Sequence, residues 1–121
     1  MNIDIIAVTK HIAEQSDDNS HRYVFAYTIT IKNNSDETVQ LLNRYWLITD
    51  ANDKKIEVKG AGVVGEQPNI DPGEEYSYTS GCILETEVGT MEGHYEFQCL
   101  NGEKVIQPID VFRLSVPNIV H

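Results

Sequence analysis

The residues that first suggest chemistry are Gly60, Gly62 and Gly65, which follow the spacing G-x-G-x-x-G. In dinucleotide-binding proteins this spacing joins a strand to a helix, and the N–H groups and dipole of the helix N-terminus hold a pyrophosphate. Here two prolines follow within eight residues, the first of them Pro68, and proline is incompatible with a helix interior. Glu66 would also place a carboxylate where phosphate should lie. The spacing therefore predicts a structurally demanding loop rather than a dinucleotide site.

Glycines in such a loop allow positive φ angles and close approach of another backbone. Successive N–H groups of the loop could form a concave nest that binds an anion such as pyrophosphate or a nucleotide phosphate. The loop could instead contact another protein, because binding residues are often found in loops on a rigid scaffold. The residues of this candidate ligand or partner loop are Gly60, Gly62, Val63, Val64, Gly65 and Glu66.

Acidic side chains offer a second kind of site. Glu74, Glu75, Glu85 and Glu87 could gather a hard divalent cation at the surface, although solvated loop carboxylates account for the same residues. The four histidines have no ligand spacing relative to one another. We therefore expect no dedicated metal site and no cofactor.

Cysteine and histidine could together support nucleophilic catalysis. Cys99 has the apolar parity of its strand and His94 has the opposite parity, so their side chains should point apart. Cys82 lies in a segment without regular alternation, and its reactivity stays open. No serine nucleophile motif is present. The sequence thus indicates a protein that is not an enzyme.

The charge balance limits the possible partners. Nine basic and nineteen acidic residues give a net charge of −10, which repels nucleic acid and anionic lipid. No run approaches the ~18 apolar residues that a membrane helix needs. The first residues include Asp4 and lack the basic start and cleavage site of a signal peptide. We expect a cytoplasmic protein that neither binds nucleic acid nor inserts into membranes.

Strands must position these residues. Apolar side chains at every second position from Tyr23 to Ile31 predict a strand with one buried face. Residues 38–50 are apolar on both parities, which indicates a strand covered on both sides or a β-bulge. Residues 82–88 are less regular and are expected to form a loop with a short strand. Further strands are expected at residues 2–8, 54–59, 75–81, 89–100 and 103–106, the last resuming after Pro108 up to Val116.

Turn residues separate these segments. Asn101-Gly102 predicts a hairpin with a type I′ turn, and Asp71-Pro72-Gly73-Glu74 predicts a type II turn. No window shows a helical apolar stripe. We therefore predict one domain, residues 1–121, that folds as an all-β antiparallel sandwich of the immunoglobulin-like or fibronectin type III-like kind, with Trp46 in its core. Stacking of Trp46 on a ligand is the alternative role.

The sequence also resembles a known family. The resemblance rests on Asn43-Arg44-Tyr45-Trp46-Leu47-Ile48, residues 60–68, Pro72-Gly73, Tyr78-Thr79-Ser80-Gly81 and Gly93-His94-Tyr95, in that order. Together these residues resemble the bacterial ApaG family, also called CorD, over almost the whole chain. The resemblance implies the same β-sandwich, which recurs in eukaryotic F-box adaptors and in a polymerase-interacting protein, where its task is protein recognition. It also implies a genetic link to cobalt resistance and magnesium efflux.

Two functions follow as hypotheses. The first is a non-enzymatic protein-interaction module with an unknown protein partner, because no catalytic set is found and the glycine loop lies between the two halves of the chain. The alternative is a small-ligand binder, with an anion at the glycine loop or a divalent cation at the acidic surface. A homodimer through an exposed edge strand is also possible in an open sandwich.

Overall fold

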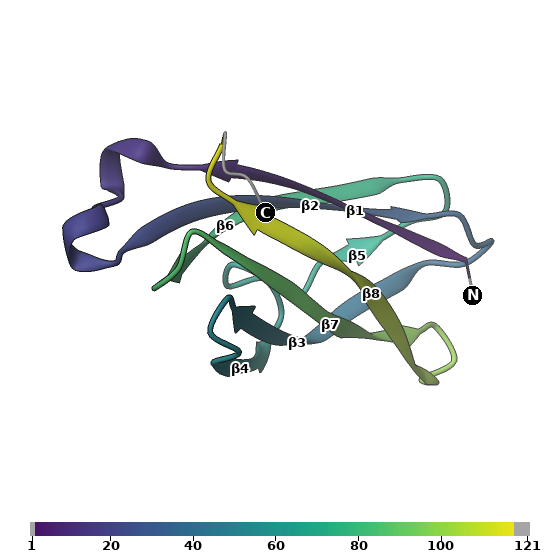
Figure 1. Cartoon of the computed structure of the whole chain (residues 1–121). Coiled ribbons are helices and arrows are strands. Elements are labelled where there is room, and N and C mark those ends of the chain that lie inside the picture. Colours follow the sequence, from purple (N-terminus) through teal and green to yellow (C-terminus); the bar gives the residue numbers. More distant parts are fainter. Residues whose placement is uncertain (1, 118–121) are drawn as a thin grey trace.

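The structure is a computed structural model that describes residues 2–117. Nearly all of this chain is extended, as its alternating pattern predicts. Two short 3₁₀ turns, η1 (Ala13–Gln15) and η2 (Asp18–Ser20), connect the first two strands. The strands, shown in Figure 1, are β1 (Ile3–His11), β2 (Tyr23–Asn33), β3 (Val39–Asp50), β4 (Lys55–Ala61), β5 (Asn69–Ile70), β6 (Glu75–Leu84), β7 (Val88–Cys99) and β8 (Lys104–Ser115).

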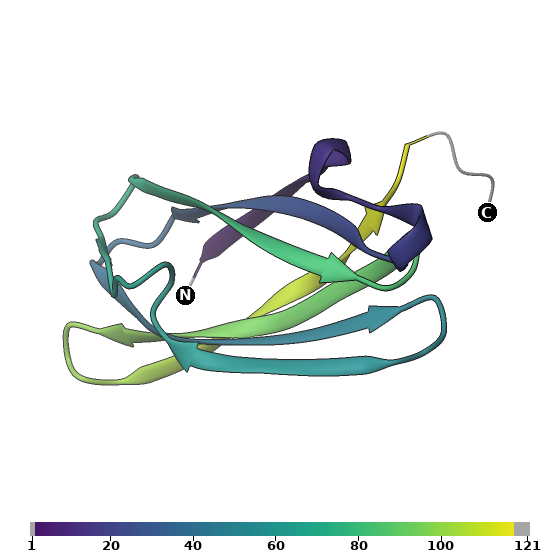
Figure 2. The same ribbon diagram turned by 90° about the vertical axis from the view of Figure 1, so that its left-hand side faces the viewer.

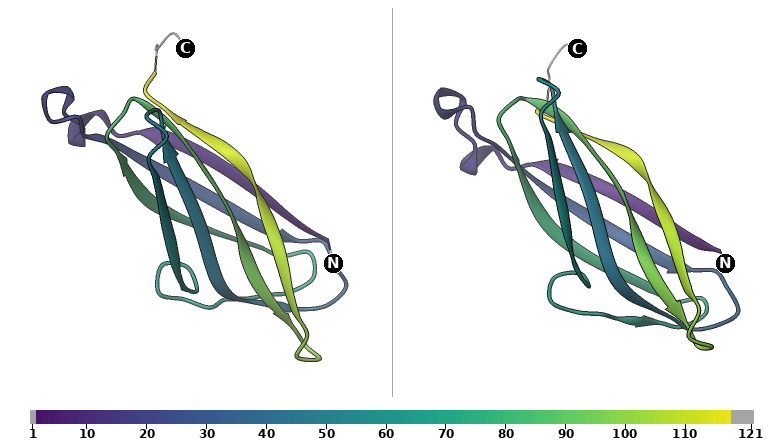
Figure 3. Two further views of the ribbon diagram at one scale, coloured as in Figure 1. Left: turned by 60° about the horizontal axis from the view of Figure 1, so that its bottom comes forward. Right: turned by 90° about the horizontal axis from the view of Figure 1, so that it is seen from below.

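The strands form two antiparallel sheets. The smaller sheet has the order β1-β2-β6, and the larger has the order β4-β3-β7-β8, with β5 paired to the start of β3. Figure 2 shows the two sheets as separate layers, and Figure 3 shows β4 and β8 at opposite edges of the larger one. This arrangement confirms the predicted antiparallel β-sandwich.

The core lies between the sheets and is built by the inward parity of each strand. Trp46 occupies its middle with 1% of its surface exposed. Its ring makes edge-on contacts with Tyr27, Tyr95 and Phe112, at centroid distances of 5.6, 6.1 and 5.7 Å. Such T-shaped pairs stabilise a core beyond the area that they bury. Trp46 is therefore a core residue, as predicted, and its buried ring leaves no open face for stacking on a ligand.

The two open sides of the sandwich differ. On one side β1 lies beside β8, and Thr9 Oγ1 donates to the Arg113 carbonyl oxygen at 3.4 Å. On the other side β4 and β6 are the sheet edges and do not pair with each other. Near one end of this side Lys54, which precedes β4, forms an ion pair with Glu85, which follows β6. This second side leaves the edge of β6 accessible.

Two strands are longer than the sequence predicted. Residues 82–88 were expected to form a loop with a short strand. Instead β6 continues to Leu84, because Cys82 and Leu84 keep the inward parity and are buried, and only residues 85–87 separate β6 from β7. The return strand was expected to break near Pro108, but β8 is continuous. Proline is tolerated there because β8 is an edge strand, and a register shift opposite Met91 and Gly93 absorbs one extra residue.

The turns follow their predicted places but not always their predicted types. The Asp71–Glu74 turn has its 3.0 Å hydrogen bond from Glu74 N to Asp71 O and a positive φ at Gly73, as type II requires. The hairpin at Asn101-Gly102 is present, but the predicted type I′ turn is wrong. Its positive φ is at Gly102, and Gly102 N donates to Cys99 O, so the loop has three residues with glycine last.

The pattern of residues 38–50 is explained by a bulge. The pairing of β3 with β7 shifts register between Leu41 and Asn43. Leu41 before the bulge and Trp46 after it are both buried, although their positions have opposite parity. The bulge places Arg44 on the inward parity of the second half of β3, next to the glycine loop.

Candidate functional site

The glycine loop is a tight two-residue hairpin. Val63 N donates to Glu66 O at 2.8 Å, and Glu66 N donates to Val63 O at 3.0 Å. The two central residues, Val64 and Gly65, have φ angles of 48° and 80°. Positive φ at both centres is the signature of a type I′ turn. The loop is therefore an ordered projection rather than a flexible connection.

The two valines of this hairpin have opposite environments. Val63 is fully buried, whereas the side chain of Val64 projects from the tip and the residue is 64% exposed. A β-branched residue in the left-handed region is strained, because Cβ approaches the following carbonyl group. Val64 thus combines exposure, an apolar side chain and a strained backbone. Strained residues of this kind cluster at functional sites.

The glycines of the motif have distinct tasks. Gly60 is not in the loop as predicted but within β4, opposite Arg44, because the strand extends two residues further than the sequence indicated. A Cβ on Gly60 would approach the Arg44 guanidinium to 2.8 Å. Gly62 has a φ of 63°, and a Cβ there would overlap the Glu66 carbonyl oxygen. The missing Cβ of Gly60 therefore leaves space for the Arg44 guanidinium, and that of Gly62 leaves space for the Glu66 carbonyl group. Gly65 has open space around it and supplies only its positive φ.

Three side chains hold the hairpin in place: Arg44 of β3, Tyr76 of β6, and Gln67, which follows the hairpin. Arg44 Nη1 donates to Ala61 O at 3.1 Å and to Gly62 O at 2.9 Å. Gln67 Nε2 donates to Leu42 O at 2.9 Å. Tyr76 donates its hydroxyl to Glu66 Oε2 at 2.8 Å, and this acceptor raises the pKa of Tyr76 above its ordinary value. The loop is thus fastened on both of its sides.

The loop offers little to an anion. The N–H groups of Gly62, Val63 and Glu66 already donate to carbonyl oxygens of the protein. The Glu66 carboxylate stands at the same hairpin and would repel a phosphate. The predicted nest of free N–H groups is therefore not formed by these three residues.

A groove of about 600 Å³ lies beside the loop on the outer face of the larger sheet. Its floor includes Tyr45 and His94, whose rings stack at a centroid distance of 5.0 Å and an angle of 22°. Lys59 Nζ lies 5.8 Å from the centre of the Tyr45 ring. Tyr45 donates its hydroxyl to Glu57, which raises the pKa of Tyr45. Gly60 and Ala61, the last two residues of β4 before the glycine hairpin, line the groove, so the groove adjoins the hairpin.

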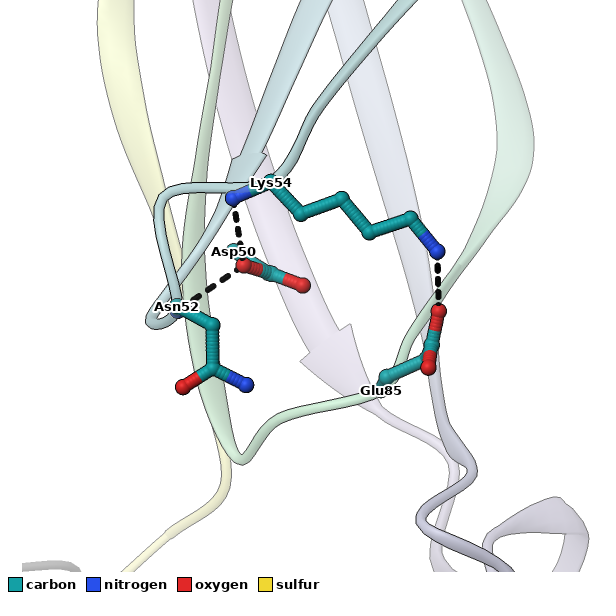
Figure 4. A network of polar contacts seen from close by, with 4 residues as sticks. All are labelled: Asp50, Asn52, Lys54 and Glu85. Atoms are coloured by element: carbon teal, nitrogen blue, oxygen red, sulfur yellow. Dashed lines mark hydrogen bonds and ion pairs between the residues drawn. The ribbon is translucent and has the colours of Figure 1, made fainter.

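The four glutamates that were candidates for a cation site lie at two ends of one strand. Glu74 and Glu75 are at the start of β6, and Glu85 and Glu87 follow its end. A ten-residue strand spans roughly 30 Å, so the four carboxylates cannot share one ion. Glu85 is held instead by Lys54, within the turn network of Figure 4. Within residues 2–117 no group of three or more His, Cys, Asp or Glu side chains is arranged to hold a metal.

In the same turn network, the Asp50 carboxylate accepts the backbone N–H groups of Asn52 and Lys54 at 2.8 and 2.9 Å (Figure 4). These bonds define the β3–β4 turn, and they account for an acidic residue at this position without a ligand.

The cysteines lie in the core. Cys99 is buried on the inward face of β7, and His94 stacks on Tyr45 on the outward face, so the predicted divergence is confirmed. Cys82 is also buried, and burial raises the pKa of its thiol to about 11. A thiol with a raised pKa is a poor nucleophile at neutral pH.

Comparison with known proteins identifies the family. The ApaG domain model matches residues 13–99, which include the glycine loop and every groove-lining residue except Ile106. The chain belongs to the ApaG family. Protein ApaG of Photobacterium profundum is 54% identical over 114 residues, which are 94% of this chain and 90% of that protein. Protein ApaG of Vibrio vulnificus strain YJ016 is 55% identical over 119 residues, 98% of this chain and 94% of that protein.

A solved structure shares the fold of this ApaG-family chain. The crystal structure of a Bordetella pertussis protein named ApaA superimposes with a TM-score of 0.95 at 42% sequence identity. The match covers 98% of this chain and 96% of that one. No helix within the described residues of the chain is long and apolar enough to cross a membrane.

Sequence reasoning missed two parts of the site. Arg44 entered the sequence analysis only as part of the segment Asn43–Ile48 that carries the family resemblance. Its position on the same parity as Trp46 and Ile48 was the available signal that it bonds to a nearby backbone. The groove beside the loop had no signal, because Tyr45, His94 and Lys59 come from three different strands. Their proximity depends on the register of β3 with β4 and β7.

Proposed function

We propose that this ApaG-family chain is a non-enzymatic protein-interaction module whose glycine loop inserts Val64 into a partner. The observation that carries the proposal is the conformation of Val64: an exposed apolar side chain, at positive φ, on a hairpin fixed by Arg44 and Tyr76. A fixed projection loses little conformational entropy on binding, and it favours tight and specific contacts. The adjoining groove would receive the neighbouring part of the partner.

The partner that we propose is a protein of the cytoplasm. The link of the family to cobalt resistance and magnesium efflux would then act through that protein rather than through ions bound by this chain. Two features support this proposal: the N–H groups of Gly62, Val63 and Glu66 already donate to carbonyl oxygens of the protein, and the four glutamates lie at opposite ends of β6.

The test is capture of partners from a native lysate with the wild-type chain and with Val64→Asn. Asparagine suits the turn better than valine, so the loop should stay formed while the apolar tip is lost. Leu100→Asn is the matched control, because Leu100 is also an exposed apolar residue in a hairpin turn. We expect Val64→Asn to lose a partner that Leu100→Asn retains. Equal capture by both variants would remove the support for the loop.

An NMR titration separates the small-ligand alternative. Pyrophosphate, a nucleotide and Mg²⁺ or Co²⁺ are added in turn to the labelled protein. Saturable shifts at Gly62 to Glu66 with pyrophosphate, or at either pair of glutamates with the cations, would favour a small-ligand site over the protein partner. We expect only weak, dispersed shifts.

A further inference from the structure

The edge of β6 differs from the other sheet edges in the described chain. Edge strands expose unpaired backbone groups, and proteins usually protect them with charges, prolines, bulges or cover. β8 has Pro108 and a bulge, and β1 lies beside β8. β4 is short and carries Lys55, Glu57 and Lys59. β6 has none of these protections, because residues 76–84 contain no charge and no proline, and pair with β2 without a register shift.

The backbone orientation along β6 follows from its pairing. The Glu74 carbonyl oxygen accepts the Asn33 N–H at 3.0 Å, so even-numbered residues direct their backbone groups towards β2. In a regular strand the odd-numbered residues Ser77, Thr79 and Gly81 then direct theirs towards the free edge. This open stretch lies between the Tyr76–Glu66 contact and the Lys54–Glu85 ion pair.

We propose that the free edge of β6 accepts an extended segment of another protein as an added antiparallel strand. Main-chain hydrogen bonds to residues 77–83 would provide the affinity, as in other cases of strand addition. The segment that fits is uncharged in its centre and basic at both ends. Exposed Glu74 and Glu75 flank the start of the edge, and exposed Glu85 and Glu87 flank its end.

The same charges argue against a second copy of this chain as the occupant. Antiparallel pairing of two β6 strands would place Glu74 and Glu75 of one copy beside Glu85 of the other, at both ends of the junction. Like charges at this spacing repel each other, and each copy carries a net charge of −10. A strand from a different protein, with basic residues at both ends, avoids the repulsion between the glutamates and the repulsion between two acidic chains.

The neighbouring side chains define the alternation of the added strand. Its inward side chains would face the open side of the sandwich, where Ile56 of β4 is 47% exposed. Its outward side chains would lie beside Ser77 and Thr79, whose hydroxyls already form a cross-strand ladder with Thr30 and Thr28 at 2.8 Å. Alternating apolar and hydroxyl-bearing residues match these two faces.

The test uses a capped synthetic peptide, Lys-Lys-Val-Thr-Val-Thr-Val-Lys-Lys, and the full chain. We expect NMR shifts along β6 and slower amide exchange at Ser77, Thr79 and Gly81. A peptide with glutamate in place of every lysine, and one with proline in place of both threonines, should not bind. Thr79→Pro, which removes an N–H at the free edge, should abolish binding while its circular dichroism stays native.

A charge variant keeps the test decisive if Thr79→Pro does not fold. Glu75→Lys combined with Glu87→Lys should weaken peptide binding roughly tenfold, because exposed ion pairs each contribute a few-fold to affinity. Glu14→Lys combined with Asp110→Lys changes the net charge equally at exposed positions away from β6 and should stay within about twofold.

Three outcomes overturn the proposal: no binding of the basic peptide, equal weakening by both charge variants, or a peptide-free dimer that forms through β6 in sedimentation equilibrium. Val64→Asn should leave peptide binding unchanged, so the result does not depend on the proposed role of the glycine loop.

Discussion

Gly62 and Val64 both have a positive φ, but the conformational free energy that this φ requires is very different for the two residues. At Gly62 the positive φ of 63° costs little, and the missing Cβ is what allows the Glu66 carbonyl group to approach. At Val64 the positive φ of 48° conflicts with a β-branched side chain, although asparagine would suit the same turn. The hydrogen bonds between Val63 and Glu66 hold Val64 in this conformation. An exposed strained residue adds nothing to folding, which supports a role in contact.

The strain predicts opposite effects of two substitutions on stability. Val64→Asn should raise the free energy of unfolding by about 1 kcal/mol, because it removes the left-handed strain of a β-branched residue. Gly62→Ala should lower it by more than about 2 kcal/mol, because it adds both strain and an overlap with the Glu66 carbonyl group. Urea unfolding of both variants measures these changes. A destabilised Val64→Asn would show that the valine contributes packing instead.

The burial of Cys82 predicts its reactivity. With its pKa raised to about 11, roughly one molecule in a thousand carries the thiolate at pH 8, so a thiol reagent should react slowly with the native protein. Both Cys82 and Cys99 should react at the rate of a free thiol in denaturant. Rapid labelling of Cys82 in the native state would indicate local opening of the β6 edge.

At the level of the elements, the bulge in β3 connects the core to the site. Without the extra residue near Leu42, Arg44 would have the parity of the outer face. With it, the guanidinium crosses over Gly60 and binds the carbonyl oxygens of Ala61 and Gly62. One strand thus provides both Trp46 for the core and Arg44 for the loop. This coupling makes the order of the loop depend on the register of β3.

Replacing the arginine should loosen the loop selectively. Arg44→Met keeps the aliphatic stem and removes both hydrogen bonds, so amide exchange at Val63 and Glu66 should become at least about tenfold faster. Arg113→Met on the edge strand β8 is the control and should leave these amides unchanged. Hydrogen exchange measured by NMR gives the comparison. Unchanged exchange in Arg44→Met would mean that the turn's own hydrogen bonds suffice.

The elements were predictable wherever one face of a strand is buried. The alternation from Tyr23 to Ile31 gave β2 within two residues at its C-terminal end, because period-two burial is a local signal. The prediction failed at Cys82–Leu84, where small and apolar residues hide the alternation, and at Pro108, where tolerance depends on β8 being an edge. The turn type at Asn101 was wrong because three-residue loops also use glycine at positive φ. These three failures depend on tertiary context.

For the whole molecule, the sequence indicated the glycine loop as a candidate site, but it did not indicate which residues of other strands surround that loop. The glycine loop was found from a motif, but Arg44, Tyr76 and the Tyr45–His94 stack join it from other strands. The spatial arrangement of the acidic residues was likewise not predictable from the sequence. Their number was plain in the sequence, but only the fold shows that they flank an open strand edge instead of forming one cluster.

The six tyrosines of the chain predict a loss of stability in alkali. All six have raised pKa values in the folded state. For Tyr78 and Tyr95, whose hydroxyls are hydrogen-bonded to each other in the core, the main cause is burial. For Tyr23, a hydrogen bond to Asp18 raises the pKa to about 12. The native state therefore keeps protons that the unfolded chain releases near pH 10.

The direction of this change in stability with pH follows from the number of protons bound in the folded and unfolded states. Below about pH 10 the tyrosines are protonated in both states and leave stability unchanged; above it the unfolded chain binds fewer protons, so stability falls as pH rises. The buried pair, Tyr78 and Tyr95, should each add a slope of about 1.4 kcal/mol per pH unit. Urea unfolding between pH 8 and about pH 11.5 measures the slope, and Tyr95→Phe should reduce it by about one tyrosine's share. A stability that stays flat to about pH 11 would show that the core tyrosines ionise in the folded state, which their burial between the two sheets opposes.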